Sequence, residues 1–227
     1  MQYGLAIATT TYFGAYNSCK DGNYRLRLFL DEVESMRGAD MAGRKVVWVI
    51  HDDASPIDFV LPQLDNVDVQ LIRHSDNRGN TGNIPRCVTH ASQLAPWTLA
   101  LDSDGLIARD CFPRLWRLVA QYPTLKVFGT FNTKYHITKE DKGTHVIKQS
   151  LCEHGVLFKS ELWKSESIRD GFGLLSNIRY DQFENNYPCL KPSGVQHTGQ
   201  YGLNGTLDDN DVEFNLDGVQ CTATTQS

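Results

Sequence analysis

Short apolar segments alternate with segments of helical periodicity along the first two-thirds of the chain. Where apolar residues run together we predict strands, at residues 5–11, 45–50, 67–72 and 97–101. Where apolar residues recur every three or four positions we predict helices, at residues 24–36, after Pro56, at 83–94, and from an Asp110 cap to about Gln121. Strands separated by helices imply βαβ crossovers, and therefore an α/β fold with a mainly parallel central sheet flanked by helices.

The last third of the chain has a different pattern, in which short apolar segments follow one another closely. The strands predicted there are residues 126–132, 145–150, 155–159 and 189–195, which indicate a small antiparallel part. Short helical segments are predicted at residues 160–165 and 181–187. After His197 the sequence is rich in Gly, Asn and Asp, so residues 201–227 are predicted to be a flexible tail or a lid. No repeat or linker is present, and we predict one domain over residues 1–227.

Composition narrows the range of functions. With 41% hydrophobic and 22% charged residues, the chain has the balance of a soluble globular protein. The net charge of −5 argues against a surface built as a whole for nucleic acid, although a local basic groove is compatible with it. No apolar run is long enough to cross a bilayer, and no basic leader precedes the first strand, so a cytoplasmic location is expected.

Polar residues cluster at the ends of three predicted strands: Thr9–Thr11, Asp52–Asp53, and Asp102 with Asp104. In a parallel sheet, ligands bind outside the carboxyl ends of the strands, so these clusters are expected to share one site. Two carboxylates at a strand end are costly to keep ionised unless a cation binds there. Oxygen ligands of this kind suit a Mg²⁺ or Mn²⁺ ion that also holds substrate phosphates. The alternative for the aspartates is a solvated turn or a helix cap.

Six short segments, in order, resemble the GT-A fold glycosyltransferases that use nucleotide sugars, and most closely their large inverting family 2. The resembling segments are residues 8–12 (Ala-Thr-Thr-Thr-Tyr), 49–55 (Val-Ile-His-Asp-Asp-Ala-Ser), 77–86 (Asn-Arg-Gly-Asn-Thr-Gly-Asn-Ile-Pro-Arg), 102–104 (Asp-Ser-Asp), 155–161 (Gly-Val-Leu-Phe-Lys-Ser-Glu) and 196–199 (Gln-His-Thr-Gly). The resemblance covers most of the chain. It implies a donor-binding half at residues 1–105 and an acceptor and catalytic half at residues 106–200.

The resemblance assigns a metal centre to the Asp-x-Asp motif. It implies that Asp104 ligates Mn²⁺ or Mg²⁺, and that Asp102 contacts the ribose or reaches the metal through water. It also implies that His197 completes the metal shell or touches the diphosphate, since neutral imidazole is a common metal ligand. A dication would stabilise the leaving diphosphate as a Lewis acid. For His197, an ordinary loop histidine is an equally good interpretation.

A pocket for the nucleotide sugar is implied by the same resemblance. Thr10 and Tyr12 would line the base, and Asp53 would accept the ring N–H of a uracil or thymine, which indicates a UDP- or dTDP-sugar. Asn83 and Arg86 would complete the site, with the guanidinium of Arg86 on the diphosphate. The alternatives are an Asx turn at Asp53, more strongly expected for the neighbouring Asp52, and an exposed helix arginine at position 86.

An inverting transfer needs a general base for the acceptor hydroxyl. Asp181 is the best match to the carboxylate that the family places on a late helix, although the frequent Glu-Asp pair is missing. Glu184 and Glu153 are the alternatives. A purely structural interpretation makes Asp181 an N-cap and Glu184 its capping-box partner.

Two other functions fit the same sheet layout. A sugar-phosphate nucleotidyltransferase is one, but the Gly-rich basic segment that this class carries after its first strand is missing here. A catalytically inactive nucleotide- or carbohydrate-binding module is the other. The acceptor is left open among a glycan, a lipid-linked glycan, a protein and a modified nucleic-acid base. His51, His74 and His90 show no spacing that groups them.

Overall fold

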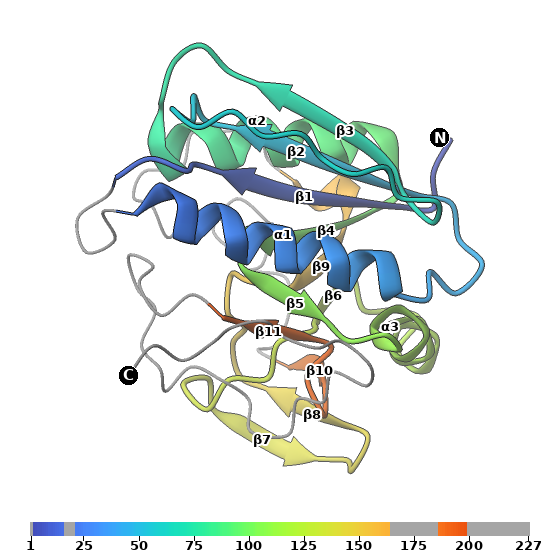
Figure 1. The fold of residues 1–227 in the computed structure, drawn as a ribbon. Helices are drawn as coiled ribbons and strands as arrows, with labels where there is room; N and C mark the ends of the chain where they lie inside the picture. Colours follow the sequence, from blue (N-terminus) through green and yellow to red (C-terminus); the bar gives the residue numbers. More distant parts are fainter. Residues whose placement is uncertain (1, 16–20, 164–185, 199–227) are drawn as a thin grey trace.

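The computed structural model describes residues 2–15, 21–163 and 186–198, and within them the chain forms three layers, with a mixed sheet between helices (Figure 1). The elements are β1 (Leu5–Thr11), α1 (Gly22–Gly38), β2 (Val46–Asp52), β3 (Asp68–Arg73), α2 (Gly79–Leu94), β4 (Trp97–Asp102), β5 (Gly105–Ile107), α3 (Cys111–Gln121), β6 (Val127–Gly129), β7 (Thr138–Asp141), β8 (His145–Lys148), β9 (Val156–Lys159), the 3₁₀ turn η1 (Ser160–Leu162), β10 (Tyr187–Leu190) and β11 (Val195–His197).

The central sheet has nine strands in the order β3-β2-β1-β4-β9-β6-β10-β8-β7. The first four strands of this order are parallel throughout. Helix α1 connects β1 to β2 and helix α2 connects β3 to β4, as the βαβ pattern predicts for these two crossovers. The other five strands pair mainly antiparallel. A second, two-stranded antiparallel sheet joins β11 to β5. The predicted α/β fold class, with a small antiparallel part, is confirmed.

Alternate residues of the central strands face two separate cores. Leu5 and Ile7 of β1 pack with Phe29 and Val33 of α1, in a core that also takes the apolar face of α3. Ala6 and Ala8 point the other way and pack against α2 in the second core. Because strand side chains alternate between the faces, β1 and β2 are buried on both. This explains why β1 is apolar over its first four residues and β2 over its first five.

The helix predicted after Pro56 is wrong, since no helix lies between β2 and β3. Ala54 has a φ of 59°, in the left-handed region, where the chain leaves the strand direction. The hydroxyl of Ser55 donates to Asp52 and accepts from the amide of Phe13. Ser55, the residue expected to cap a helix, therefore connects the loop to the end of β1 by a hydrogen bond.

Two further boundaries differ from the prediction. Helix α2 begins at Gly79, four residues earlier than expected, because a carboxylate from a distant strand caps it. The strand predicted at residues 189–195 is two strands, β10 and β11, and the second leaves the central sheet to pair with β5. Strands β5 and β7 were not predicted. Within residues 181–187, the described part is strand at Tyr187, and the remainder of that predicted helix lies outside the described residues.

Candidate functional site

Strand register brings the three predicted polar clusters to one edge of the sheet. In the parallel ladders, Thr10 of β1 lies opposite His51 of β2 on one side and Asp102 of β4 on the other. The amide of Asp53 then donates to the carbonyl of Thr11 at 2.9 Å, which holds the end of β2 beside that of β1. The ends of β1, β2 and β4 therefore form one surface, as the sequence predicts.

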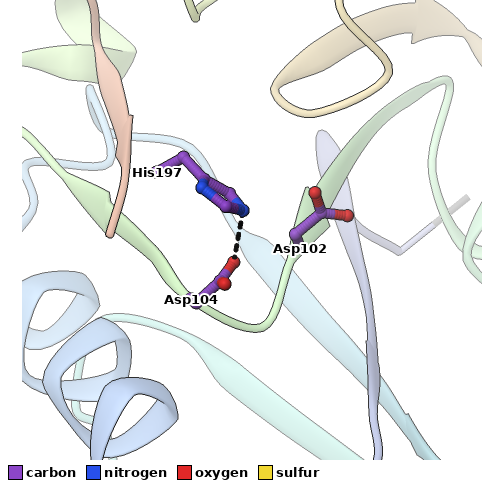
Figure 2. Close-up of side chains that lie close together, drawn as sticks. All are labelled: Asp102, Asp104 and His197. Carbon is purple, nitrogen blue, oxygen red and sulfur yellow. Dashed lines mark ion pairs between the residues drawn. The ribbon is translucent and has the colours of Figure 1, made fainter. Parts of the chain in front are cut away.

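Asp102 and Asp104 are brought together by a turn rather than by strand alternation. Strand β4 ends at Asp102, Ser103 and Asp104 form the turn, and β5 begins at Gly105. His197 lies opposite Gly105 in the β5–β11 ladder, and its Nε2 is 3.1 Å from Oδ1 of Asp104. Figure 2 shows the imidazole and this carboxylate pointing toward one another, with Asp102 to one side. One ligand atom from each of the three residues lies within 4.8 Å of the others.

This donor set fits a hard dication. Two carboxylates and one imidazole supply ligand types that Mn²⁺ accepts, and Asp102 is exposed enough to share an ion with a bound substrate. Burial opposes ionisation of Asp104, but the hydrogen bond and charge of His197, with smaller effects of His154 and Arg25, lower its pKa overall. Asp104 is therefore held as the carboxylate that a cation needs.

His154 is a residue of this site to which sequence reasoning gave no role. Its Nδ1 lies 3.0 Å from the backbone N–H of Asp102 and accepts its hydrogen bond, which leaves the ring proton on Nε2. The ring packs beside that of His197, with centroids 5.5 Å apart. It also fills the space over Gly105, where a Cβ atom would come within 2.6 Å of its Cε1. His154 thus fixes the turn that carries Asp104.

The two aspartates at the end of β2 have hydrogen-bond partners on the protein itself. The carboxylate of Asp52 accepts from Thr11 Oγ1 and from the amide of Ser55. That of Asp53 accepts from the amides of Arg78 and Gly79, at 2.7–3.1 Å, and so caps α2. The amide that Asp52 binds is that of Ser55, three residues on, rather than two residues on as in the Asx turn expected there.

A pocket opens between β1, β4 and α2, next to the Asp-x-Asp turn. It is lined by Thr10, Asp102 and Glu153 and by small and apolar side chains of the three elements. Of the three predicted general-base candidates, Glu153 thus lies in the same pocket as Asp102. Asp181 and Glu184 lie outside the described residues. Tyr12 folds over Gly14, where its ring leaves no room for a side chain.

Asn83 contacts the end of β2, whereas Arg86 pairs with Asp76 in the segment after β3. Nδ2 of Asn83 donates to the carbonyl of His51 at 3.0 Å, so its amide supports the strand end. Nη2 of Arg86 lies 3.7 Å from Oδ1 of Asp76. The positive charge of Arg86 also lowers the pKa values of His51 and His74.

Three histidines for which the sequence gave no grouping form a hydrogen-bonded chain. Nδ1 of His51 lies 3.2 Å from Nε2 of His74, and its Nε2 lies 3.3 Å from Nδ1 of His90. Burial, then the charges of the two other histidines and of Arg86, lower the pKa of His51 to about 4. His51, the middle histidine of the three, is therefore uncharged near neutral pH. Residues from β2, α2 and the segment after β3 meet here, which no local spacing reveals.

Among the described residues, none of the helices has the length and apolar character needed to cross a bilayer.

Sequence comparison finds no matching family model and no matching curated protein. Structural comparison finds residues 1–349 of S. aureus TarS, with a TM-score of 0.57 and 13% identity over 85% of this chain and 59% of that one. The same part of TarS in complex with UDP gives a TM-score of 0.58 at 12% identity, over 85% and 59%. In complex with UDP-GlcNAc it gives 0.56 at 12%, over 87% and 60%.

The chain spans about three-fifths of the length of the TarS structures that it matches. At this level of identity the match establishes the fold, while the reaction has to be argued from the site itself. These matches, over a mixed α/β chain with a mainly parallel half-sheet, show that the chain has a GT-A-type glycosyltransferase fold.

Proposed function

We propose that the protein is a metal-dependent glycosyltransferase that moves a sugar from a UDP- or dTDP-type nucleotide sugar to an acceptor hydroxyl, with inversion at the anomeric carbon. The observation that carries the proposal is the group formed by Asp102, Asp104 and His197 at the carboxyl edge of a GT-A-type sheet. TarS, which shares the fold, has been solved with UDP and with UDP-GlcNAc. Bound Mn²⁺ or Mg²⁺ would supply Lewis-acid stabilisation of the leaving diphosphate.

In this proposal, residues of the chain itself bind the cation and the nucleotide sugar. Asp104 and His197 hold the cation, and Asp102, which is more exposed, reaches both the cation and the ribose. Thr10 and Tyr12 line the base beside Asp53, and Arg86 pairs with the diphosphate. In this proposal Asp53 keeps its bonds to α2 and uses a remaining lone pair for the base N–H, since each carboxylate oxygen accepts more than one hydrogen bond.

The acceptor hydroxyl must lose its proton as it attacks the anomeric carbon. We assign this role to Asp181, with Glu184 and Glu153 as the alternatives. The position of Glu153 in the pocket beside Asp102 supports that alternative. The acceptor class stays open among glycans, lipid-linked glycans, proteins and modified nucleic-acid bases.

A thermal-shift screen of nucleoside diphosphates and nucleotide sugars, each with and without Mn²⁺, tests the proposal. A ligand that binds only the folded chain raises the unfolding midpoint, by about 2.7 kcal/mol of stability at a hundred times its Kd. We expect a shift that needs both Mn²⁺ and a UDP- or dTDP-type ligand, and that disappears in Asp104→Asn. An unchanged shift in Asp104→Asn would contradict the metal role.

The screen is followed by a turnover assay that separates the competing functions. Release of the nucleoside diphosphate from the donor is the expected result. Pyrophosphate release from a nucleoside triphosphate and a sugar phosphate would support a nucleotidyltransferase instead. Donor binding without turnover on any acceptor would support a binding module.

A further inference from the structure

Glu32 is an anomaly in the core of the protein. Its side chain is 0% exposed, and neither carboxylate oxygen has a hydrogen-bond partner among the described residues. Burying a carboxyl group without partners is costly, and an apolar residue of similar size would serve the core better. A buried polar group of this kind calls for an explanation, such as a bound ion or an ordered water.

The position of Glu32 on α1 directs it toward the Asp-x-Asp turn. Ser35, one turn later on the same helix face, accepts a hydrogen bond from the amide of Ile107 on its Oγ at 3.0 Å. Helix α1 and strand β5 lie side by side and run in the same direction (Figure 1). Glu32 therefore faces the beginning of β5, where Asp104 lies.

Electrostatics gives the same location independently of the helix geometry. Burial raises the pKa of Glu32 well above its usual range, and the charges of Asp104 and then Asp102 raise it further. Those two carboxylates are the ones proposed to bind the cation. The charges of Asp102 and Asp104 therefore both reach Glu32. Its oxygens are nevertheless not among the ligand atoms that lie within 4.8 Å of one another.

We propose that Glu32 is a further acidic residue of the dication site. From its position on α1 it accepts hydrogen bonds from water molecules bound to the ion. The inference rests on the proposed function, because it assumes an ion at Asp102 and Asp104. A small dication such as Mg²⁺ keeps several waters when it binds to a protein, and those waters are the donors that the two oxygens of Glu32 lack. Glu32 is a positioning residue, since it acts on the ion through water.

The test uses Glu32→Gln with Glu34→Gln as its matched control, because Glu34 lies on the same helix but is exposed and paired with Arg37. Mn²⁺ binding is measured by electron paramagnetic resonance without nucleotide, and Tm is measured without metal. We expect Glu32→Gln to weaken Mn²⁺ binding about tenfold, the size typical of outer-shell partners, and to raise Tm. Glu34→Gln should change neither.

A second variant, Glu32→Asp, keeps the carboxyl group and separates the proposed role from a loss of packing. Binding of Mn²⁺ by Glu32→Asp should lie between wild type and Glu32→Gln, even if its Tm falls. Unchanged Mn²⁺ binding in Glu32→Gln, or equal losses in both variants, would overturn the inference and leave the proposed function intact. A wild-type protein that binds no Mn²⁺ would overturn the metal-dependent function and the inference with it.

Discussion

Two groups of carboxylates lie at the same edge of the sheet and have opposite environments. Asp52 and Asp53, after β2, accept hydrogen bonds from a hydroxyl and from backbone amides of neighbouring loops. The group at the β4–β5 turn is different: Asp102 is exposed, Asp104 faces an imidazole, and Glu32 is buried with no hydrogen-bond partner among the described residues. The four aspartates of the two groups all lie at strand ends, so local sequence alone does not distinguish them.

This difference shows how to distinguish carboxylates that stabilise the fold from carboxylates that are available to bind a ligand. A carboxylate whose oxygens are used by amides and hydroxyls stabilises the fold, and its loss leaves those donors unsatisfied. A buried carboxylate kept near others without such donors weakens the fold, and it takes up a proton or binds a cation to offset the cost. The pattern of hydrogen-bond donors gives the β2 group a role in holding the fold, and it supports the cation site that we propose at the β4–β5 turn.

The largest expected effect is that of Asp52→Ala. It leaves the hydroxyl of Thr11 and the amide of Ser55 without their acceptor, and should lower the free energy of unfolding by about 2–4 kcal/mol. Mn²⁺ affinity should stay within about twofold of wild type, because the β4–β5 turn is untouched. Urea denaturation and a metal titration measure the two quantities.

Asp58→Ala is the matched control for this substitution. Both aspartates pair with Arg73, but the Asp58 side chain is fully exposed. Its removal should leave stability almost unchanged, since solvent screens such a pair. Loss of Mn²⁺ binding in a folded Asp52→Ala protein would break the distinction between the two groups.

A smaller effect is expected from Gly105→Ala. The new methyl group would lie 2.6 Å from Cε1 and 3.0 Å from Nε2 of His154, so the ring that holds the Asp102 amide must move. Overpacking of this kind costs about 1–3 kcal/mol. We expect both a lower Tm and weaker Mn²⁺ binding. Gly38→Ala is the control, because a Cβ there meets nothing within 4 Å; equal Mn²⁺ affinity in both variants would argue against the supporting role of His154.

The smallest effect concerns pH. The pKa of His51 is about 4 in the folded chain, lowered by burial and by its neighbours, against 6.5 in the unfolded chain. Between these values the unfolded state binds the extra proton, so stability falls as pH falls from 6.5 toward 4, at about 1 kcal/mol per pH unit. Denaturation at pH 7, 6 and 5 should show this loss, and His51→Asn should reduce the slope. An equal slope in the variant would mean that other histidines cause it.

The sequence predicts most of what local pattern controls. Strand β1 was predicted with its observed bounds, and the Asp-x-Asp motif was located from its place after an apolar strand. The failures have a common physical cause, which is hydrogen bonding between segments far apart in the chain. Asp53 starts α2 earlier than its local sequence suggests, and Ser55 binds Phe13 instead of capping a helix.

The same cause explains what sequence reasoning missed at the site. Asp102 and His154 are 52 residues apart, and only the β4–β9 pairing brings them together. Glu32 reads as an ordinary helix glutamate between Asp31 and Glu34, since local sequence does not reveal that its face of α1 packs on β5. The partner of each residue is set by the assembled sheet.

The pairing of β11 with β5 has a consequence for how the protein is made. His197 reaches Asp104 only through this ladder, which joins segments about ninety positions apart. A ribosome that has just added Asp104 must still add more than ninety residues before the imidazole exists. Nascent chains that end before His197 carry both aspartates and Glu32 without the histidine, so the proposed cation-binding set is completed by a strand made long after the turn that it meets.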